Sequence, residues 1–259
     1  MRFLRAIGKF MLFSVVVILI SIFQPIVMLF TRGPKGYILP RLWHKATCFI
    51  FGIRVHVEGT PASSQQTIFM SNHISYLDIP VLGSLLQASF VAKQEVATWP
   101  LFGFLATLQQ TAFLERKKSA IGKAKNGLQG MMNEGKSLII FPEGTSTDGQ
   151  IVRPFKTSLF ELARNTNHPD LLVQPVTIRV DSTDGHAITT QDLRDLYSWH
   201  IDMDTEFGSH LWRFAQTSGC ELTVTFHSPL QPLTFNDRKS LSQACFKAVS
   251  GGLKAKQMA

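Results

Sequence analysis

Residues 67–78 read TIFMSNHISYLD and join a short apolar run to the start of a second element. The run Thr67–Ser71 is rich in residues that favour β-structure and has the length of a buried strand. The polar residues after it predict a loop, and Asp78 suits the first turn of a helix. A strand, a loop and a helix in this order form the repeating unit of an α/β fold.

The same pattern continues along the chain, with helical stretches between β-rich runs. The clearest helix candidate is Ala120–Glu134, whose apolar residues share one face. Strands that alternate with helices predict an α/β fold with a mostly parallel sheet flanked by helices, and its sites lie at the carboxyl ends of strands. Residues 181–220 are polar and irregular, so we expect a loop-rich insertion. The further β-rich runs are Ser89–Ala92, Thr111–Leu114, Ser137–Phe141, Leu171–Ile178 and Glu221–Phe226.

The N-terminal segment has a different composition. Residues 10–31 (FMLFSVVVILISIFQPIVMLFT) carry no charge, and a helix of this length rises about 33 Å, roughly the thickness of a bilayer's hydrocarbon core. A cleaved signal peptide is the rival reading, but no A-x-A-like site follows. Pro25 permits a kink, so both a membrane span and a shallow dip stay open. Residues 38–55 fit an interfacial helix. We therefore expect a membrane-anchoring helical segment at 1–55 and an α/β domain at 56–259.

Charge is concentrated in that N-terminal segment. The chain has a formal net charge of +8, but residues 1–54 hold eight basic residues and no acidic one, so the rest of the chain is formally neutral. A neutral body argues against a nucleic-acid partner. Three scattered cysteines and eight dispersed histidines indicate neither a disulfide framework nor a metal site.

His73 and Asp78 form the first candidate site. A histidine in the loop and an aspartate in the first helical turn can meet, so that Asp78 holds one ring nitrogen and leaves the other free to accept a proton. The alternative is a histidine at a strand end and an aspartate that caps a helix.

Two further motifs end strands with polar residues. In Phe141-Pro142-Glu143-Gly144-Thr145, Glu143 is a carboxylate at a strand end, and the amides of Gly144 and Thr145 suit an anionic or hydroxyl-bearing group. The alternative is a simple Pro-Gly turn. Arg116 ends the run Phe113-Leu114-Glu115-Arg116 and suits a phosphate group; the alternative is a solvated charge cluster.

These blocks, with the later proline strand around Pro175, resemble the glycerolipid acyltransferase family typified by 1-acylglycerol-3-phosphate acyltransferases. The resemblance covers roughly residues 50–180. It implies that His73 is the general base and Asp78 its orienter. It also implies that Arg116, Glu143, Gly144 and Thr145 help hold the acceptor lipid. Lys156 stands where many relatives have a basic residue.

The resemblance implies a reaction without a covalent enzyme intermediate. The free hydroxyl of a lysolipid attacks the thioester of acyl-CoA or of an acyl carrier protein, and no cofactor or metal takes part. The implied role is membrane lipid biosynthesis, with membrane lipids as partners. The implied location is the bacterial inner membrane, with the site on the cytoplasmic side.

Two departures from the family pattern bear on the acceptor. Ser146 and Ser158 replace the arginine and glycine that many phosphatidate-forming relatives have. The blocks at residues 90–96 and 99–103 look like those of bacterial members that acylate lyso-ornithine lipid. Both a 1-acyl-sn-glycerol-3-phosphate acceptor and a lyso-ornithine lipid acceptor therefore stay open. A membrane-anchored lipid hydrolase is the rival class, but the chain lacks the G-x-S-x-G string typical of such enzymes.

Overall fold

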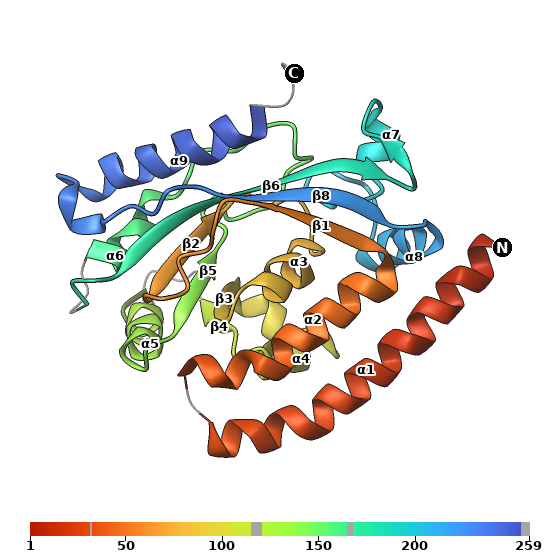
Figure 1. The fold of residues 1–259 in the computed structure, drawn as a ribbon, viewed down its shortest axis with the longest axis horizontal. Coiled ribbons are helices and arrows are strands. Elements are labelled where there is room, and N and C mark those ends of the chain that lie inside the picture. The colour runs from red at the N-terminus through yellow and green to blue at the C-terminus, as the bar shows by residue number, and fades with distance from the viewer. Residues whose placement is uncertain (32, 115–120, 165–167, 255–259) are drawn as a thin grey trace.

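The computed structural model describes residues 1–31, 33–114, 121–164 and 168–254, which form a β-sheet flanked by helices (Figure 1). Eight strands in this part of the chain pair in the order β1-β8-β6-β2-β5-β3-β4, with β7 added to β6. Neighbours run parallel except where β6 meets β8 and β7. The predicted mostly parallel sheet is confirmed. The strands are β1 (Ile53–Glu58), β2 (Thr67–Ser71), β3 (Ala88–Lys93), β4 (Ala112–Leu114), β5 (Ser137–Ile140), β6 (Leu172–Thr183), β7 (His186–Ala187) and β8 (Cys220–Phe226).

All six predicted β-rich runs overlap observed strands, and β2 has the predicted bounds. Strand β6 runs on to Thr183 because its second half pairs with β8, whereas its first half pairs with β2. Strand β1 was not predicted, although Ile53–Glu58 alternates apolar and polar residues as a half-buried strand does.

Helices cover both faces of the sheet because successive strand residues point to opposite sides. Phe69 of β2 packs against one hydrophobic cluster, to which α1, α2, α3 and α8 contribute. Its neighbours Ile68 and Met70 pack against the other, formed with α5, α6 and α9. The helices are α1 (Arg2–Phe30), α2 (Ile38–Phe51), α3 (Asp78–Leu85), α4 (Phe102–Leu108), α5 (Ile121–Asn133), α6 (Glu161–Arg164), α7 (Gln191–Arg194), α8 (Phe207–Gln216) and α9 (Arg238–Lys254).

Helix α1 is docked along the body of the protein beside α2 (Figure 1). Two polar side chains on its inner face bond to distant backbone carbonyls. Lys9 Nζ donates to the oxygens of Phe51 (2.9 Å) and Thr217 (3.0 Å). Gln24 Nε2 donates to the oxygens of Gly36 (3.0 Å) and Leu108 (3.2 Å). The helix is therefore attached to the body near both ends.

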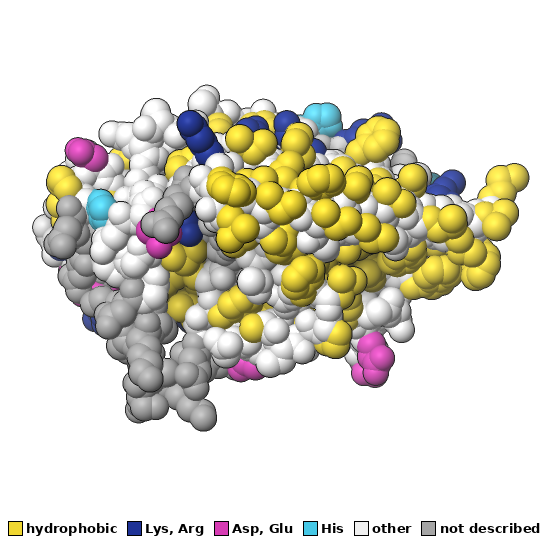
Figure 2. All heavy atoms as spheres, turned by 90° about the horizontal axis from the view of Figure 1, so that it is seen from below, with side chains coloured by type: hydrophobic (Ala, Val, Ile, Leu, Met, Phe, Trp, Pro, Cys, Tyr) yellow, Lys and Arg dark blue, Asp and Glu magenta, His cyan; other side chains and the backbone are white. Residues whose placement is uncertain are grey.

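The outer face of α1 is apolar. Figure 2 shows hydrophobic side chains gathered over this side of the molecule. Among them, Ile18, Leu19, Ile22 and Phe23 are each about half exposed, at 49–58%. Within the described residues, α1 is the one helix long and apolar enough to cross a membrane.

The expected interfacial helix over residues 38–55 is only partly present. Helix α2 ends at Phe51, where Gly52 adopts a φ of +76°, a conformation that favours glycine. A Cβ on Gly52 would also collide with the Ser218 carbonyl. The chain then enters β1, so the expected domain boundary after residue 55 falls inside that strand.

The expectation of a loop-rich insertion at residues 181–220 is wrong in part. This region contains the end of β6, β7, α7 and α8. Tyr197, His210 and Phe214 are fully buried. These elements were difficult to predict from the sequence because their apolar face is narrow and most of their residues are polar. In the structure this face packs against α1 and α2.

Candidate active site

His73 and Asp78 meet at the carboxyl end of β2. His73 lies in the loop after the strand, and Asp78 begins α3. The His73 Nδ1 atom is 2.8 Å from Asp78 Oδ2. The side chain of His73 is 21% exposed, and Nε2 has no hydrogen-bond partner among the described residues. The predicted pair therefore exists, with one ring nitrogen held and the other available.

Asp78 is fully buried, and four donors hold its carboxylate. Oδ2 accepts the His73 bond and the backbone N–H groups of Ile74 (2.7 Å) and Ser75 (3.0 Å). From the part of the chain that the structure describes, Oδ1 accepts a single bond, from the Tyr197 hydroxyl at 2.9 Å. Burial raises the pKa of the Tyr197 phenol well above its ordinary value, so this group stays protonated and donates.

Tyr197 is the residue that sequence reasoning missed. It lies 119 positions after Asp78, in the region expected to be a loop-rich insertion. No local spacing links the two residues. In the sequence, Tyr197 stands as a single tyrosine in a polar segment, and this pattern does not by itself predict a buried contact with the site.

Aromatic packing and the neighbouring strands hold the His73 ring in place. The ring stacks on Phe141, with centroids 4.1 Å apart and planes 18° apart. The preceding residue, Asn72, bonds through its side chain to both backbone groups of Ile178 on β6. His73 is thus held between the ends of β2 and β5 and the middle of β6.

Glu143 holds the backbone of the site. Its carboxylate is buried and accepts the N–H groups of His73 (2.8 Å, Oε1) and Arg153 (2.6 Å, Oε2). Burial raises its pKa to about 7, and the two backbone donors oppose that rise. Since both oxygens are occupied, Glu143 positions the His73 loop and does not face an open cavity.

Gly144 and Lys156 lie together after β5. Gly144 has a φ of +72°, and a Cβ there would collide with Lys156 Nζ. The Gly144 amide donates to the Phe141 oxygen (3.0 Å), so it is not open to a ligand as expected. The Thr145 amide has no acceptor among the described residues, and neither does the exposed Lys156 ammonium. Arg116 lies outside the described residues.

Ser75 is not placed as a nucleophile. It is fully buried, and its Oγ accepts the Leu77 N–H (3.3 Å). No contact between Ser75 Oγ and the His73 ring occurs. The described residues also contain no group of three or more His, Cys, Asp or Glu side chains that suits a metal ion.

Comparison with known proteins agrees with this geometry. The sequence model of the acyltransferase family matches residues 52–179. The chain is 33% identical to the lyso-ornithine lipid O-acyltransferase of Brucella abortus, over 92% of this chain and 91% of that protein. It is 37% identical to the lyso-ornithine lipid O-acyltransferase of Rhodobacter capsulatus, over 79% of this chain and 71% of that protein.

A solved structure gives the same fold. The crystal structure of the 1-acyl-sn-glycerophosphate acyltransferase PlsC from Thermotoga maritima covers 100% of this chain and 99% of its own. Its TM-score is 0.73 at 20% identity, which shows a shared fold. The His73–Asp78 pair, the match over residues 52–179 and the full-length relative together show that this chain belongs to the acyltransferase family and is an acyltransferase.

Proposed function

We propose that this enzyme moves a fatty acyl group from an acyl thioester to the free hydroxyl of a lyso-ornithine lipid. The observation that carries the chemistry is the buried Asp78 carboxylate, which holds His73 with Nε2 available. Ser75 makes no contact with His73, so no acyl-enzyme is expected. This arrangement favours direct transfer over the serine chemistry of a lipid hydrolase.

The reaction then proceeds in two stages. His73 Nε2 accepts the hydroxyl proton while the hydroxyl oxygen bonds to the thioester carbonyl carbon. The tetrahedral intermediate next breaks its C–S bond, and the leaving thiolate takes the proton from the imidazolium. The products are an ester and a free thiol, so acyl-CoA or an acylated carrier protein is the only co-substrate required. General-base help of this kind is typically worth about a hundred- to ten-thousandfold.

Two donors after β5 suit the oxygens of the reacting lipid. Within the described residues the Thr145 amide has no acceptor, and the Lys156 ammonium, which lies over Gly144, has no ion pair. A backbone amide and a cation directed at a developing oxyanion lower the barrier to acyl transfer. We assign these two groups to stabilising the intermediate.

The relatives and Ser146 together support the acceptor. The lyso-ornithine lipid enzymes of Brucella abortus and Rhodobacter capsulatus match this chain over more of its length than the 1-acyl-sn-glycerol-3-phosphate acyltransferases of Brassica napus (63% of this chain) and Neisseria gonorrhoeae (40%). Ser146 stands where the family pattern of phosphatidate-forming members has arginine, and its hydroxyl donates to the Trp199 carbonyl (2.7 Å). A zwitterionic head needs less cationic charge than a phosphate does.

A direct comparison of acceptors tests this proposal. The purified enzyme is given a labelled acyl thioester, on coenzyme A or on carrier protein, with lyso-ornithine lipid or 1-acyl-sn-glycerol-3-phosphate. We expect a higher kcat/KM for lyso-ornithine lipid, and we expect Ser146→Arg to move the preference toward the phosphate lipid. A wild-type preference for the phosphate lipid would overturn the acceptor assignment and leave the acyl-transfer chemistry intact.

We also propose that α1 lies in one leaflet of the bacterial inner membrane, with the site on the cytoplasmic side. A spanning helix would need to leave the body, but Lys9 and Gln24 bond α1 to it at 2.9–3.2 Å. The outer apolar face fits a helix that lies in the interface. Acyl thioesters are cytoplasmic donors, and the three free, buried cysteines suit a reducing compartment.

A further inference from the structure

A small pocket lies directly beside the active-site loop. Its volume is about 230 Å³, and it is bounded by Ile74 and by the turn at Asp148 and Gly149. Pockets that enclose drug-sized ligands run to about 300–1,000 Å³. The pocket therefore has room for a head group and not for an acyl chain.

Two arginines line this pocket from different elements. Arg179 comes from β6, and Arg194 ends α7. Buried nitrogens of both, Arg179 Nη2 and Arg194 Nε, have no hydrogen-bond partner among the described residues. A buried guanidinium N–H without an acceptor is costly, so such groups point to a missing anion. Neither arginine belongs to the motifs that identified the enzyme.

The pocket also contains negative charge. Asp181 is already paired, because Oδ1 lies 2.9 Å from Arg179 Nε and Oδ2 accepts the Thr223 hydroxyl. Asp148 forms no ion pair with any described residue, although Gln150 donates to both of its oxygens. Two guanidinium groups beside two carboxylates give the pocket no net formal charge, which suits a ligand with one anionic and one cationic group better than a doubly charged phosphate.

Backbone contacts connect the pocket to the catalytic base. Ile74, which borders the pocket, is the residue after His73. The Thr147 N–H donates to the His73 carbonyl (2.9 Å), and Gly149 packs against the Ile74 side chain. A head group in the pocket is therefore anchored next to the residue that activates the hydroxyl.

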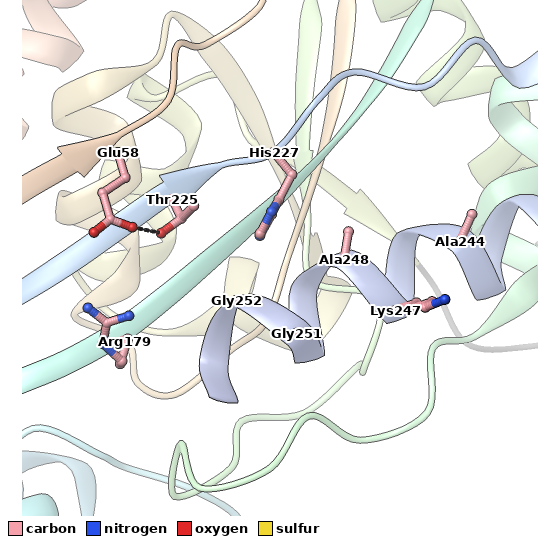
Figure 3. Close-up of a pocket in the computed structure, with 9 residues that line it drawn as sticks. All are labelled: Glu58, Arg179, Thr225, His227, Ala244, Lys247, Ala248, Gly251 and Gly252. Atoms are coloured by element: carbon pink, nitrogen blue, oxygen red, sulfur yellow. Dashed lines mark hydrogen bonds between the residues drawn. The ribbon is translucent and has the colours of Figure 1, made fainter. Parts of the chain in front are cut away.

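A second, wider hollow shares Arg179 but not this connection. It measures about 790 Å³ and lies between α9 and the strands β1, β6 and β8, where Figure 3 shows Arg179 below Glu58 and His227. The Glu58 carboxylate there accepts the Thr225 hydroxyl (2.8 Å). None of the His73 loop lines that hollow, so it offers no route to the reacting atoms.

We propose that the smaller pocket binds the zwitterionic head of the acceptor. Arg179 and Arg194 bind its carboxylate, and Asp148 receives its ammonium group. This assignment rests on the proposed lyso-ornithine lipid acceptor, since ornithine carries both charges. Charge-assisted hydrogen bonds between a guanidinium and a carboxylate are among the strongest polar contacts available to such a head.

The test pairs a change in the enzyme with a change in the lipid. Acylation rates are measured for lyso-ornithine lipid and for its carboxyl methyl ester, with wild type and Arg194→Gln. We expect the methyl ester to lower the wild-type kcat/KM about 10- to 100-fold. Arg194→Gln should lower kcat/KM for the native acceptor and reduce the penalty of the ester, because only Arg179 then remains to bind the carboxylate. Such non-additivity identifies a direct contact.

Control variants separate binding from folding. Arg213→Gln removes the same charge from an exposed site on α8, where the guanidinium donates to the Asp192 carbonyl of α7 (3.2 Å), and should behave as wild type. Arg194→Lys keeps a cation and should retain part of the discrimination. Thermal unfolding of each variant checks the fold.

The outcomes distinguish the two proposals. If wild type acylates lyso-ornithine lipid and its methyl ester equally well, the pocket assignment is wrong and the acceptor assignment stands. An ester penalty of the same size in wild type and Arg194→Gln also overturns the pocket. If wild type does not acylate lyso-ornithine lipid at all, the acceptor assignment itself fails, and the pocket assignment fails with it.

Discussion

Tyr197→Phe removes one hydroxyl from the buried network behind the catalytic base. Among the described residues that hydroxyl is the single donor to Asp78 Oδ1, whereas Oδ2 keeps three others. The variant therefore leaves a fully buried carboxylate oxygen without a partner, and the ring still fills its place. We expect an enzyme that still folds and keeps the orientation of His73, but with a lower free energy of unfolding and a lower kcat.

The two oxygens of Asp78 determine different effects: Oδ1 the loss of stability and Oδ2 the loss of kcat. Loss of the partner of a buried charged group costs about 1–3 kcal/mol. Because no described residue can replace the donor to Oδ1, we expect the free energy of unfolding to decrease by an amount near the upper end of that range. The contacts of Oδ2 that orient His73 are unchanged, so we expect kcat to fall only about tenfold, or about 1.4 kcal/mol.

Tyr37→Phe is the matched control. Tyr37 is also a buried tyrosine with a hydrogen-bonded hydroxyl, but its partner is Ser89. We expect a loss of stability in Tyr37→Phe, measured by denaturant unfolding, with kcat unchanged. If Tyr197→Phe loses stability while its kcat matches that of the control, Tyr197 is only a core residue and the positioning role is refuted.

Three further results are expected. His73→Ala should lose at least a hundredfold in kcat because the base is gone, while Ser75→Ala stays active; a trapped acyl-enzyme, dependent on Ser75, would contradict direct transfer. Burial raises the pKa of Glu143 from 4.5 to about 7, so its contribution to stability is lost as pH rises through that range, by up to about 3 kcal/mol. Denaturant unfolding of Glu143→Gln should depend less steeply on pH than that of wild type, and parallel curves would refute the assignment. Lysines at Leu19 and Ile22 on the exposed face of α1 should move the protein from membrane to soluble fractions, and unchanged membrane binding would show that another surface anchors it.

Local patterns in the sequence were sufficient for the centre of the fold and of the site. Thr67–Ser71 and Ser137–Phe141 are apolar runs that end in motifs, so both the strands and the loops after them were predictable. The contact between His73 and Asp78 was also predictable, because a loop followed by a helical turn closes a five-residue separation.

Contacts between distant segments could not be predicted. Tyr197 reaches Asp78 across 119 positions, and Lys9 reaches Thr217 across 208. Such pairs depend on how complete elements pack and leave no spacing in the chain. Gln24 is similar: it lies within an apolar helix, and its amide attaches α1 to the backbone at Gly36 and Leu108.

The attachment of α1 has a consequence for kinetics. A helix on a flexible tether would let the enzyme sample depths and orientations, but Lys9 and Gln24 make the helix and the catalytic body one rigid unit. With α1 in one leaflet, as we propose, the enzyme meets its acceptor within the plane of the bilayer. Its rate should follow the mole fraction of lysolipid in the bilayer and not the bulk concentration, and adding inert lipid should slow turnover as dilution slows a reaction in solution.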